Sequence, residues 1–179
     1  MNKALLVLAA LVLSASTCAV YARGEILKQA LAIESHLLKT ATAPEDPEAT
    51  YHGARIVHNV TVRGQKGMRV HASFTVKYGL NNPCRLIAYF YYDDEENTPL
   101  ASGDANYRTT EGNVSARSNF TPKYDPAYYK DLQLFIPYEA LNMESEEEYD
   151  LKFYLALYDD SGQRFFGKSP WYKFKLTMP

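Results

Sequence analysis

Cysteine is scarce in this sequence, and its scarcity limits how the protein can be held together. The 179 residues include two cysteines, Cys18 and Cys84. Cys18 falls in an N-terminal segment that we expect to be removed, which leaves Cys84 with no partner for an intrachain disulfide. The folded part must therefore be stabilised by its hydrophobic core. Cys84 stands at the start of a predicted strand, where a buried and unreactive thiol is expected.

A basic surface and the common catalytic motifs are also missing. Lysine and arginine number 19 against 21 acidic residues, for a net charge of −2, and no run of basic residues forms a stripe. The sequence therefore gives no electrostatic reason to bind nucleic acid. It contains no phosphate-binding glycine loop, no GxSxG nucleophile turn and no HExxH zinc motif. We expect a protein that is not an enzyme and needs no cofactor.

Long apolar runs are confined to the N-terminus. Lys3 precedes an apolar stretch over residues 4–15, and small residues before Arg23 form a cleavage sequence that ends at Ala22. This is the layout of a secretory signal peptide over residues 1–22, and the stretch is too short for a permanent membrane helix. The predicted location is therefore secreted, periplasmic or at the cell surface.

Cys18 offers an alternative for the same segment. A lipoprotein signal also places small residues before a cysteine, as LSASTC does here. However, Ala15 stands where that signal prefers leucine, and Thr17 is a poor residue before the cleaved bond. Cleavage near Ala22 is therefore favoured. A lipid anchor on Cys18 is the alternative, and it is the one route to a membrane that we predict.

Two short segments separate the signal peptide from the main domain. Residues 23–39 carry apolar side chains at three- and four-residue spacing, which predicts an amphipathic helix. Residues 40–53 contain two prolines, acids and small residues, which predict a linker. The helix could pack on the domain, associate with another copy or lie on a membrane. Its polar face is mixed rather than basic, which weakens the membrane alternative.

From residue 54 to residue 179 the hydrophobic period is two, the period of β-strands. In MRVHASFTVK, for example, Met68, Val70 and Phe74 alternate with polar residues. Seven or eight such segments with almost no helical pattern between them predict an antiparallel β-sandwich of the immunoglobulin-like kind. A closed barrel is the alternative. The segments are 55–62, 68–78, 85–92, 105–109, 113–118, 131–138, 148–159 and 169–178, of which 105–109 and 113–118 are the weakest.

These strands resemble a known domain in their amino-acid sequence as well as in their hydrophobic period. The stretches KGMRVHASFTV, AYFYYDDEENTPL, YRTTEGNVS, FTPKYD, LFIPYEAL and YDLKFYLALYD are similar to an uncharacterised β-sandwich domain of secreted bacterial proteins. In some relatives that domain follows a caspase-like or trypsin-like peptidase domain, where this chain carries the predicted helix and linker. The resemblance covers residues 54–178 and implies a β-sandwich, export, and an accessory or recognition role. It brings no catalytic or binding residue with it.

Two acidic corners raise the question of a metal or catalytic site. Asp93 and Asp94 end one aromatic strand, and Asp159 and Asp160 end another. Turn-forming residues follow each pair, which predicts hairpin tips, although acidic loops also suit calcium. A glycosidase pair is disfavoured because acids at hairpin tips rarely face each other across a cleft. A shared calcium site requires both corners at one end, which holds if 105–109 is a separate strand and fails if it is not.

The aromatic content, 13% with 15 tyrosines, is the second functional signal. Tyr124, Tyr128 and Tyr129 fall in a predicted loop, and together with Trp171 they are candidates for binding a protein or stacking on a glycan. The tyrosines of the strands, Tyr89, Tyr91 and Tyr154, are predicted to be ordinary half-buried residues.

The sequence therefore predicts a secreted, non-enzymatic β-sandwich that recognises a protein in the cell envelope or outside the cell. Carbohydrate binding through the loop 124–129 is the alternative.

Overall fold

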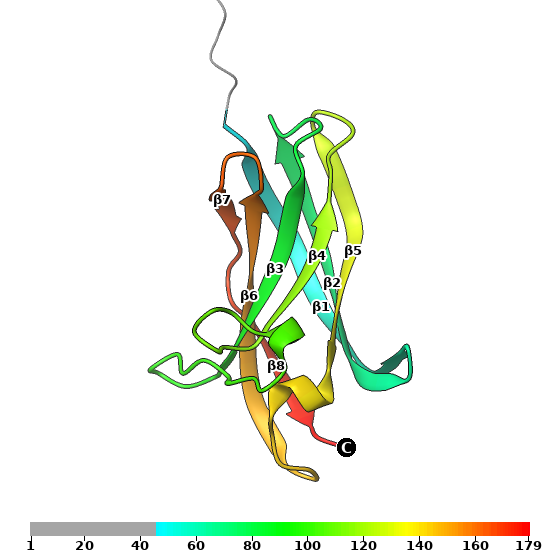
Figure 1. Cartoon of the computed structure of the whole chain (residues 1–179), viewed down its shortest axis with the longest axis vertical. Coiled ribbons are helices and arrows are strands. Elements are labelled where there is room, and N and C mark those ends of the chain that lie inside the picture. The colour runs from blue at the N-terminus through cyan, green and yellow to red at the C-terminus, as the bar shows by residue number, and fades with distance from the viewer. Residues whose placement is uncertain (1–45) are drawn as a thin grey trace, which may run out of the picture. The chain divides into compact units, whose positions relative to one another are not determined.

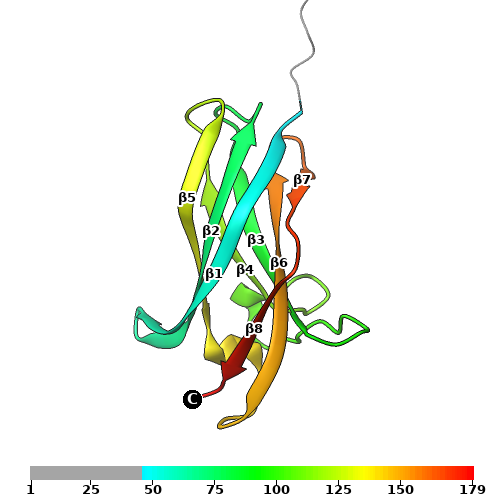
Figure 2. The ribbon, with the colours of Figure 1, turned by 180° about the vertical axis from the view of Figure 1, so that it is seen from behind.

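The computed structural model describes residues 46–179, which fold into one compact unit. The predicted signal peptide, the helix 23–39 and residues 40–45 of the linker lie outside the described residues. Eight strands form two antiparallel sheets that face each other as layers (Figures 1 and 2). The three-stranded sheet has the order β1 (Glu48–Val62), β2 (Gln65–Lys77) and β5 (Ala127–Pro137). The five-stranded sheet has the order β4 (Ser115–Phe120), β3 (Cys84–Tyr92), β6 (Glu148–Asp159) and β7 (Arg164–Lys168), and β8 (Tyr172–Thr177) also pairs with β6.

The two sheets make a sandwich rather than a barrel. Within residues 46–179 no strand pairing joins one sheet to the other, so the barrel alternative is wrong. The alternation predicted for β2 is confirmed, because Met68, Val70 and Phe74 are fully buried between the layers. Phe90 of β3 and Phe153 of β6 meet them from the facing sheet. Burial of each of these side chains contributes roughly 1.5–3 kcal/mol to folding.

The first strand begins earlier than the sequence predicts. Residues 48–53, predicted as the end of a linker, belong to β1 and pair with β2. Tyr51 packs against Phe74, with the ring centroids 6.1 Å apart. The alternation was hidden because the pairing shifts register at Gly53, whose φ of 154° few other residues adopt.

The predicted strand 105–109 is wrong. Residues Ala105–Tyr107 form a short 3₁₀ helix, η1, and the Asp104 carboxylate accepts a hydrogen bond from the Asn106 backbone N–H at 2.8 Å. Asp and Asn compete with strand pairing in this way because their side chains bond nearby backbone groups. The connection from β3 to β4 is therefore a long loop that is held by isolated bridges.

The edge of the five-stranded sheet is broken between β7 and β8. At the break the Leu155 N–H of β6 donates to the Ser169 hydroxyl at 2.8 Å, and the Ser169 N–H donates to the Leu155 carbonyl. The buried Ser169 hydroxyl thus replaces a strand carbonyl as the acceptor for Leu155, and Pro170, which has no N–H to donate, follows it. Trp171 follows directly and leaves the core. Another short helix, η2 (Tyr138–Leu141), joins β5 to β6.

Cys84 lies at the start of β3, as predicted, and is buried. Burial and the nearby carboxylates of Asp159 and Asp160 raise the pKa of its thiol to about 12. The thiol therefore stays protonated at neutral pH and is a poor nucleophile. Within residues 46–179 no helix has the length and apolar character needed to cross a membrane.

Candidate functional site

The predicted tyrosine loop is a loop only over residues 124–126, which include Tyr124. Strand β5 begins at Ala127, so Tyr128 and Tyr129 are neighbouring strand residues and point to opposite faces of the sheet. Tyr129 packs into the core, with its ring centroid 4.9 Å from that of Phe74 and 4.9 Å from that of Phe120. Tyr128 and Tyr124 are exposed, at 70% and 76% of their surface.

Trp171 does not join these tyrosines. It lies between β7 and β8 on the five-stranded sheet, whereas Tyr128 belongs to the three-stranded sheet. Trp171 is 39% exposed and its ring packs on the edges of Tyr91 and Tyr154, with both centroid distances 5.1 Å. The four candidates for carbohydrate binding therefore do not form one site.

The two acidic corners lie at opposite ends of the sandwich. In the antiparallel pairing of β3 with β6, Cys84 faces Asp159 and Tyr92 faces Leu151. The corner after β3 is therefore far from the corner after β6, as expected once 105–109 is not a strand. A calcium site shared by both corners is wrong. No group of three or more metal-ligating side chains occurs within residues 46–179.

The carboxylates of each corner bond to other groups of the protein instead. The Asp94 carboxylate accepts a hydrogen bond from the Thr98 N–H at 2.9 Å, and the Asp159 carboxylate accepts one from the Ser161 N–H at 2.9 Å. Asp160 forms an ion pair with Arg85. These are the contacts of turn-forming residues, which confirms the prediction of hairpin tips.

Asp93 holds two lysines of the five-stranded sheet. Its carboxylate lies 2.9 Å from the Lys173 ammonium and 3.7 Å from that of Lys152, which is almost fully buried. The hydrogen bond from Lys173 and the charge of Lys152 lower the pKa of Asp93 below its ordinary value of 3.8. Lys152 also donates to the Asp94 carbonyl at 2.7 Å.

The lowered pKa predicts how the Asp93→Asn variant behaves with pH. An acid whose pKa is lower in the folded state stabilises that state above its unfolded pKa, and this stabilisation disappears as pH falls through the folded pKa. We therefore expect Asp93→Asn to lower the urea midpoint at pH 7, and the difference from wild type to vanish below the folded pKa of Asp93. Urea unfolding between pH 7 and pH 2 measures this. Glu96→Gln, at an exposed acid of the same loop with no ion pair in residues 46–179, is the control. A difference that persists at the lowest pH would contradict the prediction.

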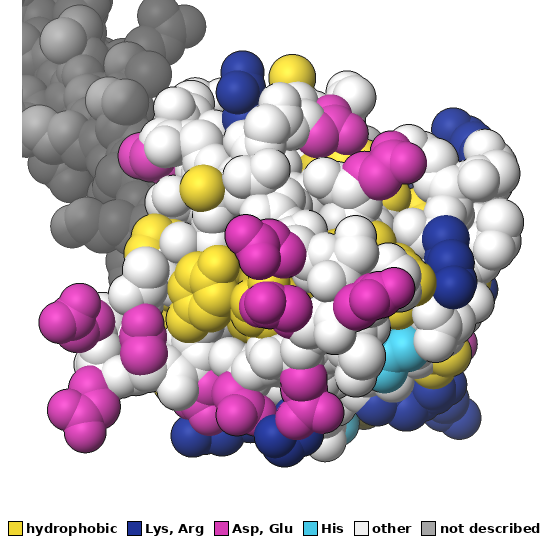
Figure 3. All heavy atoms as spheres, turned by 90° about the horizontal axis from the view of Figure 1, so that it is seen from below, with side chains coloured by type: hydrophobic (Ala, Val, Ile, Leu, Met, Phe, Trp, Pro, Cys, Tyr) yellow, Lys and Arg dark blue, Asp and Glu magenta, His cyan; other side chains and the backbone are white. Residues whose placement is uncertain are grey.

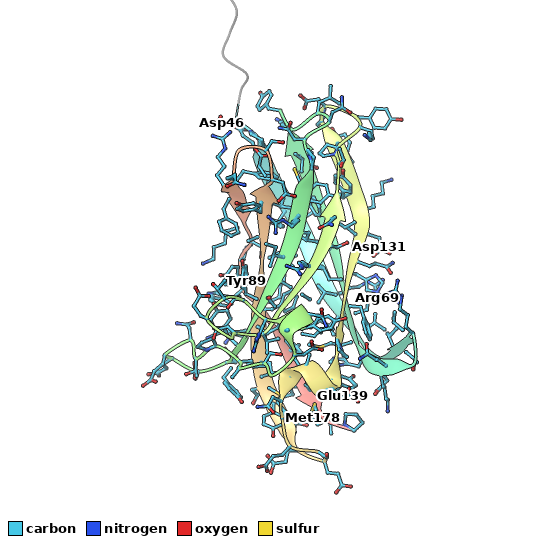
Figure 4. The ribbon with its side chains drawn as sticks, in the orientation of Figure 1. Asp46, Arg69, Tyr89, Asp131, Glu139 and Met178 are labelled. Carbon is cyan, nitrogen blue, oxygen red and sulfur yellow. The ribbon has the colours of Figure 1, made fainter. Side chains whose placement is uncertain are left out.

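A histidine and a carboxylate pair on the outer face of the three-stranded sheet. His71 Nδ1 lies 2.6 Å from an Asp131 carboxylate oxygen and 3.2 Å from the Arg55 guanidinium (Asp131 is labelled in Figure 4). A catalytic triad also requires a hydroxyl or thiol bonded to the other ring nitrogen, Nε2. Within residues 46–179 none is present. The pair is a hydrogen-bonded contact between β2 and β5 rather than half of a triad.

The outer face of the five-stranded sheet is aromatic. Because side chains alternate along a strand, the residues beside the core positions of β3 and β6 point outward together. We call this set the tyrosine face: Tyr89 and Tyr91 of β3, Tyr154 and Tyr158 of β6, Phe165 of β7, and Trp171. Figure 4 labels Tyr89 within it.

The rings of the tyrosine face are packed on one another. Tyr154 lies between Tyr89 and Tyr91, with centroid distances of 5.1 and 5.8 Å in stacked geometry. Phe165 meets the edge of Tyr158 at 5.0 Å and remains 58% exposed. Offset and edge-on aromatic pairs of this kind are worth about 0.5–1.5 kcal/mol each beyond the area they bury.

Three cations lie over these rings. The Lys168 ammonium is 4.2 Å from the Tyr154 centroid, and the Arg85 guanidinium carbon is 4.6 Å from that of Tyr158. The Lys152 ammonium is 5.3 Å from the Trp171 centroid. Cation–π contacts fix these side chains in position, so the face combines ordered aromatic and ordered positive groups.

A groove of about 540 Å³ runs across the tyrosine face. Its floor consists of residues from the two central strands, namely Tyr89, Tyr91, Tyr154 and Ala156. One wall comes from the loop between β3 and β4 and the other from β7. The loop wall contributes Thr109, Glu111 and Asn113, and the β7 wall contributes Phe165, Gly167 and Lys168.

The two walls carry opposite charges. Hydrogen bonds from the Thr109 and Thr110 side chains and its own backbone lower the pKa of Glu111, so its carboxylate is ionised at neutral pH. Neither Glu111 nor Lys168 has an ion-pair partner within residues 46–179. The groove therefore offers one negative and one positive group that are each ready to pair with a ligand.

Two of the groove tyrosines, Tyr89 and Tyr154, lie in surroundings that favour the protonated phenol. Burial raises the pKa of Tyr89 and of Tyr154, and a hydrogen bond with Tyr91 contributes to the rise for Tyr154. These two phenols therefore remain protonated and can donate hydrogen bonds to a ligand.

One end of the sandwich is strongly acidic. Residues 93–114 and 138–150 form loops and strand ends there, and each of these segments contains six acidic residues against a single arginine, Arg108, in the two together. Figure 3 looks onto this end and shows the acidic side chains gathered across it.

The sequence does not predict the tyrosine face as a site. Tyr89, Tyr91 and Tyr154 look like ordinary strand residues in it, because either strand alone shows only alternation. The signal that could have revealed the face is that two strands both place tyrosines at outward positions. That signal has meaning only once β3 and β6 are known to be neighbours.

No model of a known protein family matches the chain, and no curated protein matches it significantly.

Proposed function

We propose that this protein is an exported, non-enzymatic recognition module that binds a protein partner through the tyrosine face. The observation that carries the proposal is the continuous set of outward aromatic side chains across β3, β6 and β7, with a groove between two charged walls. Tyrosine, tryptophan and arginine are the residues enriched in protein interfaces. Their rings bury apolar area while the hydroxyl and charged groups give direction.

The packing of the rings favours a protein over a sugar. A pyranose stacks on an open aromatic face, but the Tyr154 ring is already contacted by Tyr89, Tyr91, Trp171 and Lys168. What these rings present to a ligand is therefore their edges and hydroxyl groups. Such groups suit the side chains and backbone of a protein surface.

An immunoglobulin-like topology is part of the proposal, and two observations support it. The first, second and fifth strands share one sheet, and the third, sixth and last strands share the other, as in immunoglobulin domains, with only β4 on the other side. At the start of β6 the Tyr149 hydroxyl accepts a hydrogen bond from the Glu144 N–H at 3.2 Å. A tyrosine at this corner that bonds upstream backbone is a mark of the immunoglobulin fold.

Export is supported by the sequence of residues 1–22 and by the resemblance to a domain of secreted bacterial proteins. A recognition module outside the cytoplasm would meet partners in the envelope or the extracellular space.

The proposal is tested by face-dependent capture. The full chain, tagged and labelled with nitrogen-15, is crosslinked in an extract of the native host's envelope, and mass spectrometry identifies the retained proteins. We expect Phe165→Ala to reduce capture of the main retained protein at least tenfold, on the order of a hot-spot residue. Phe165 is 58% exposed, so its loss leaves the fold intact, which a melting curve checks.

Tyr128→Ala is the matched control, because it removes an aromatic side chain that is 70% exposed on the other sheet. It should capture as much partner as the wild type does. If Phe165→Ala captures as well as the wild type, or if Tyr128→Ala is equally impaired, the tyrosine face is not the binding surface and the proposal is wrong.

A further inference from the structure

We propose that the protein bound at the tyrosine face is a second copy of this chain, in a two-fold symmetric dimer in which Lys168 of each copy pairs with Glu111 of the other. This inference rests on the proposed function, since it names the partner of the same face. It follows from the placement of the groove walls relative to the floor.

The first step concerns symmetry. The groove floor lies on the central strands β3 and β6, with Glu111 on the wall at one side and Lys168 on the wall at the other. A two-fold axis that lies in the interface, parallel to the sheet and running along the strands between the two walls, turns a second copy to face the first and exchanges its walls. It therefore sets the positive wall of one copy against the negative wall of the other. A two-fold interface has to be self-complementary in this way.

The second step concerns the unpaired groups. Lys168 is held over the Tyr154 ring at 4.2 Å and has no carboxylate partner in residues 46–179. The Glu111 carboxylate, which the Thr110 hydroxyl contacts at 3.2 Å, has no cation partner there either. A two-fold dimer supplies a carboxylate for each Lys168 and an ammonium group for each Glu111. A partner with one sign of charge would leave either the lysine or the glutamate facing a like charge or none.

The third step concerns apolar surface. Phe165 and Trp171 stand on the same side of the sheet, 58% and 39% exposed, and the half-buried tyrosines lie between them. In a face-to-face dimer these side chains cover one another's exposed area. Well-packed aromatic centres with a polar rim are typical of stable interfaces.

The last step excludes association by the acidic end. Residues 93–114 and 138–150 give that end a net negative charge in every copy, so two copies repel each other there. The tyrosine face, whose two walls carry Glu111 and Lys168, presents both signs of charge instead.

The test uses charge reversal in the full chain. Wild type, Lys168→Glu, Glu111→Lys and an equimolar mixture of the two variants are compared by analytical ultracentrifugation up to about 500 μM, a range that detects weak interfaces. Each variant alone sets two like-charged pairs across the interface, and we expect its dimer dissociation constant to rise at least tenfold. In the mixture, a heterodimer restores both opposite-charge pairs, so we expect dimers to return to near wild-type strength.

Lys130→Glu, which reverses a lysine exposed on β5 of the other sheet, is the control and should dimerise as the wild type does. Thermal melts verify that every variant is folded. The inference is overturned if the wild type stays monomeric over the whole range, if the reversed variants dimerise as the wild type does, or if the mixture forms no dimer. In the capture experiment, the nitrogen-15 label distinguishes bait from a native copy. Capture of a different protein that depends on Phe165 would leave the proposed function standing and this inference refuted.

Discussion

Replacement of Gly67 by alanine is expected to destabilise the domain by about 3 kcal/mol or more, at the upper end of the cost of overpacking. A Cβ at this position would lie 2.2 Å from the Ile136 carbonyl oxygen and 2.7 Å from the Pro137 Cα. Both are backbone atoms of β5, so no side-chain rotation relieves the clash. Either β2 or β5 has to move, and the pairing between Gly67 and Pro137 is lost.

A thermal melt followed by circular dichroism measures this effect. For a domain of this size, 3 kcal/mol corresponds to a fall in melting temperature of roughly 10 °C. Gly103→Ala is the matched control, since a Cβ there meets nothing within 4 Å and its backbone is not in the left-handed region. Equal melting temperatures for the two variants would mean that β2 and β5 do not approach as closely as described.

Replacement of Phe153 by alanine is expected to cost about 3–5 kcal/mol, the usual range for a buried phenylalanine. Phe153 is 1% exposed, and its ring lies 5.8 Å from Phe90, 5.2 Å from Tyr172 and 5.9 Å from Phe174 between centroids. The loss removes the shared contact that joins β3, β6 and β8. Since the free energy of unfolding of a domain is only about 5–15 kcal/mol, Phe153→Ala removes a large part of it.

Urea unfolding measures the loss, which should appear as a lower midpoint with an unchanged slope. Phe165→Ala is the matched control, because it removes the same side chain from the surface of the same sheet. We expect Phe165→Ala to change stability by less than about 1 kcal/mol, as exposed substitutions usually do. If both variants lost the same stability, the assignment of Phe153 to the core and Phe165 to the surface would be wrong.

These two phenylalanines separate stability from recognition. Phe153 faces the core of the five-stranded sheet and Phe165 faces outward beside the groove. The first should matter for folding at any concentration of partner. The second should matter only for capture and for dimer formation. A variant set built on this pair can therefore tell loss of binding from loss of fold.

For the acidic corners, the sequence predicts the local turns but not whether the two corners lie near each other. The composition of each corner was enough to predict a turn, because Asp, Asn, Ser and Gly favour turns through contacts with their own neighbours. Whether the corners meet depended on the strand count between them, and that count depended on residues 105–109. Their alternation resembled a strand, but the Asp104 carboxylate caps a 3₁₀ turn there instead.

The prediction of a loop over residues 124–129 was wrong from Ala127 onward for a related reason. Prolines and lysines around the tyrosines obscured the start of β5 at Ala127. Once the strand begins there, alternation sends Tyr129 into the core beside Phe74 and leaves Tyr128 in solvent. Chemical type alone could not divide these two neighbours, because a tyrosine suits both environments.

The sequence by itself determined what depends on near neighbours along the chain. The period of two specified most of the strands and their buried faces, although it missed β7 and the starts of β1 and β5 and placed a false strand at 105–109. The turn residues specified the corners, and the isolated Cys84 specified a core without disulfides. The tertiary structure alone decided which strands are neighbours and in which register. It placed the tyrosines of β3 beside those of β6, and it put Glu111 and Lys168 on facing walls of one groove. The reason is that strand pairing joins segments far apart in the chain, and a period of two fits many partners equally well.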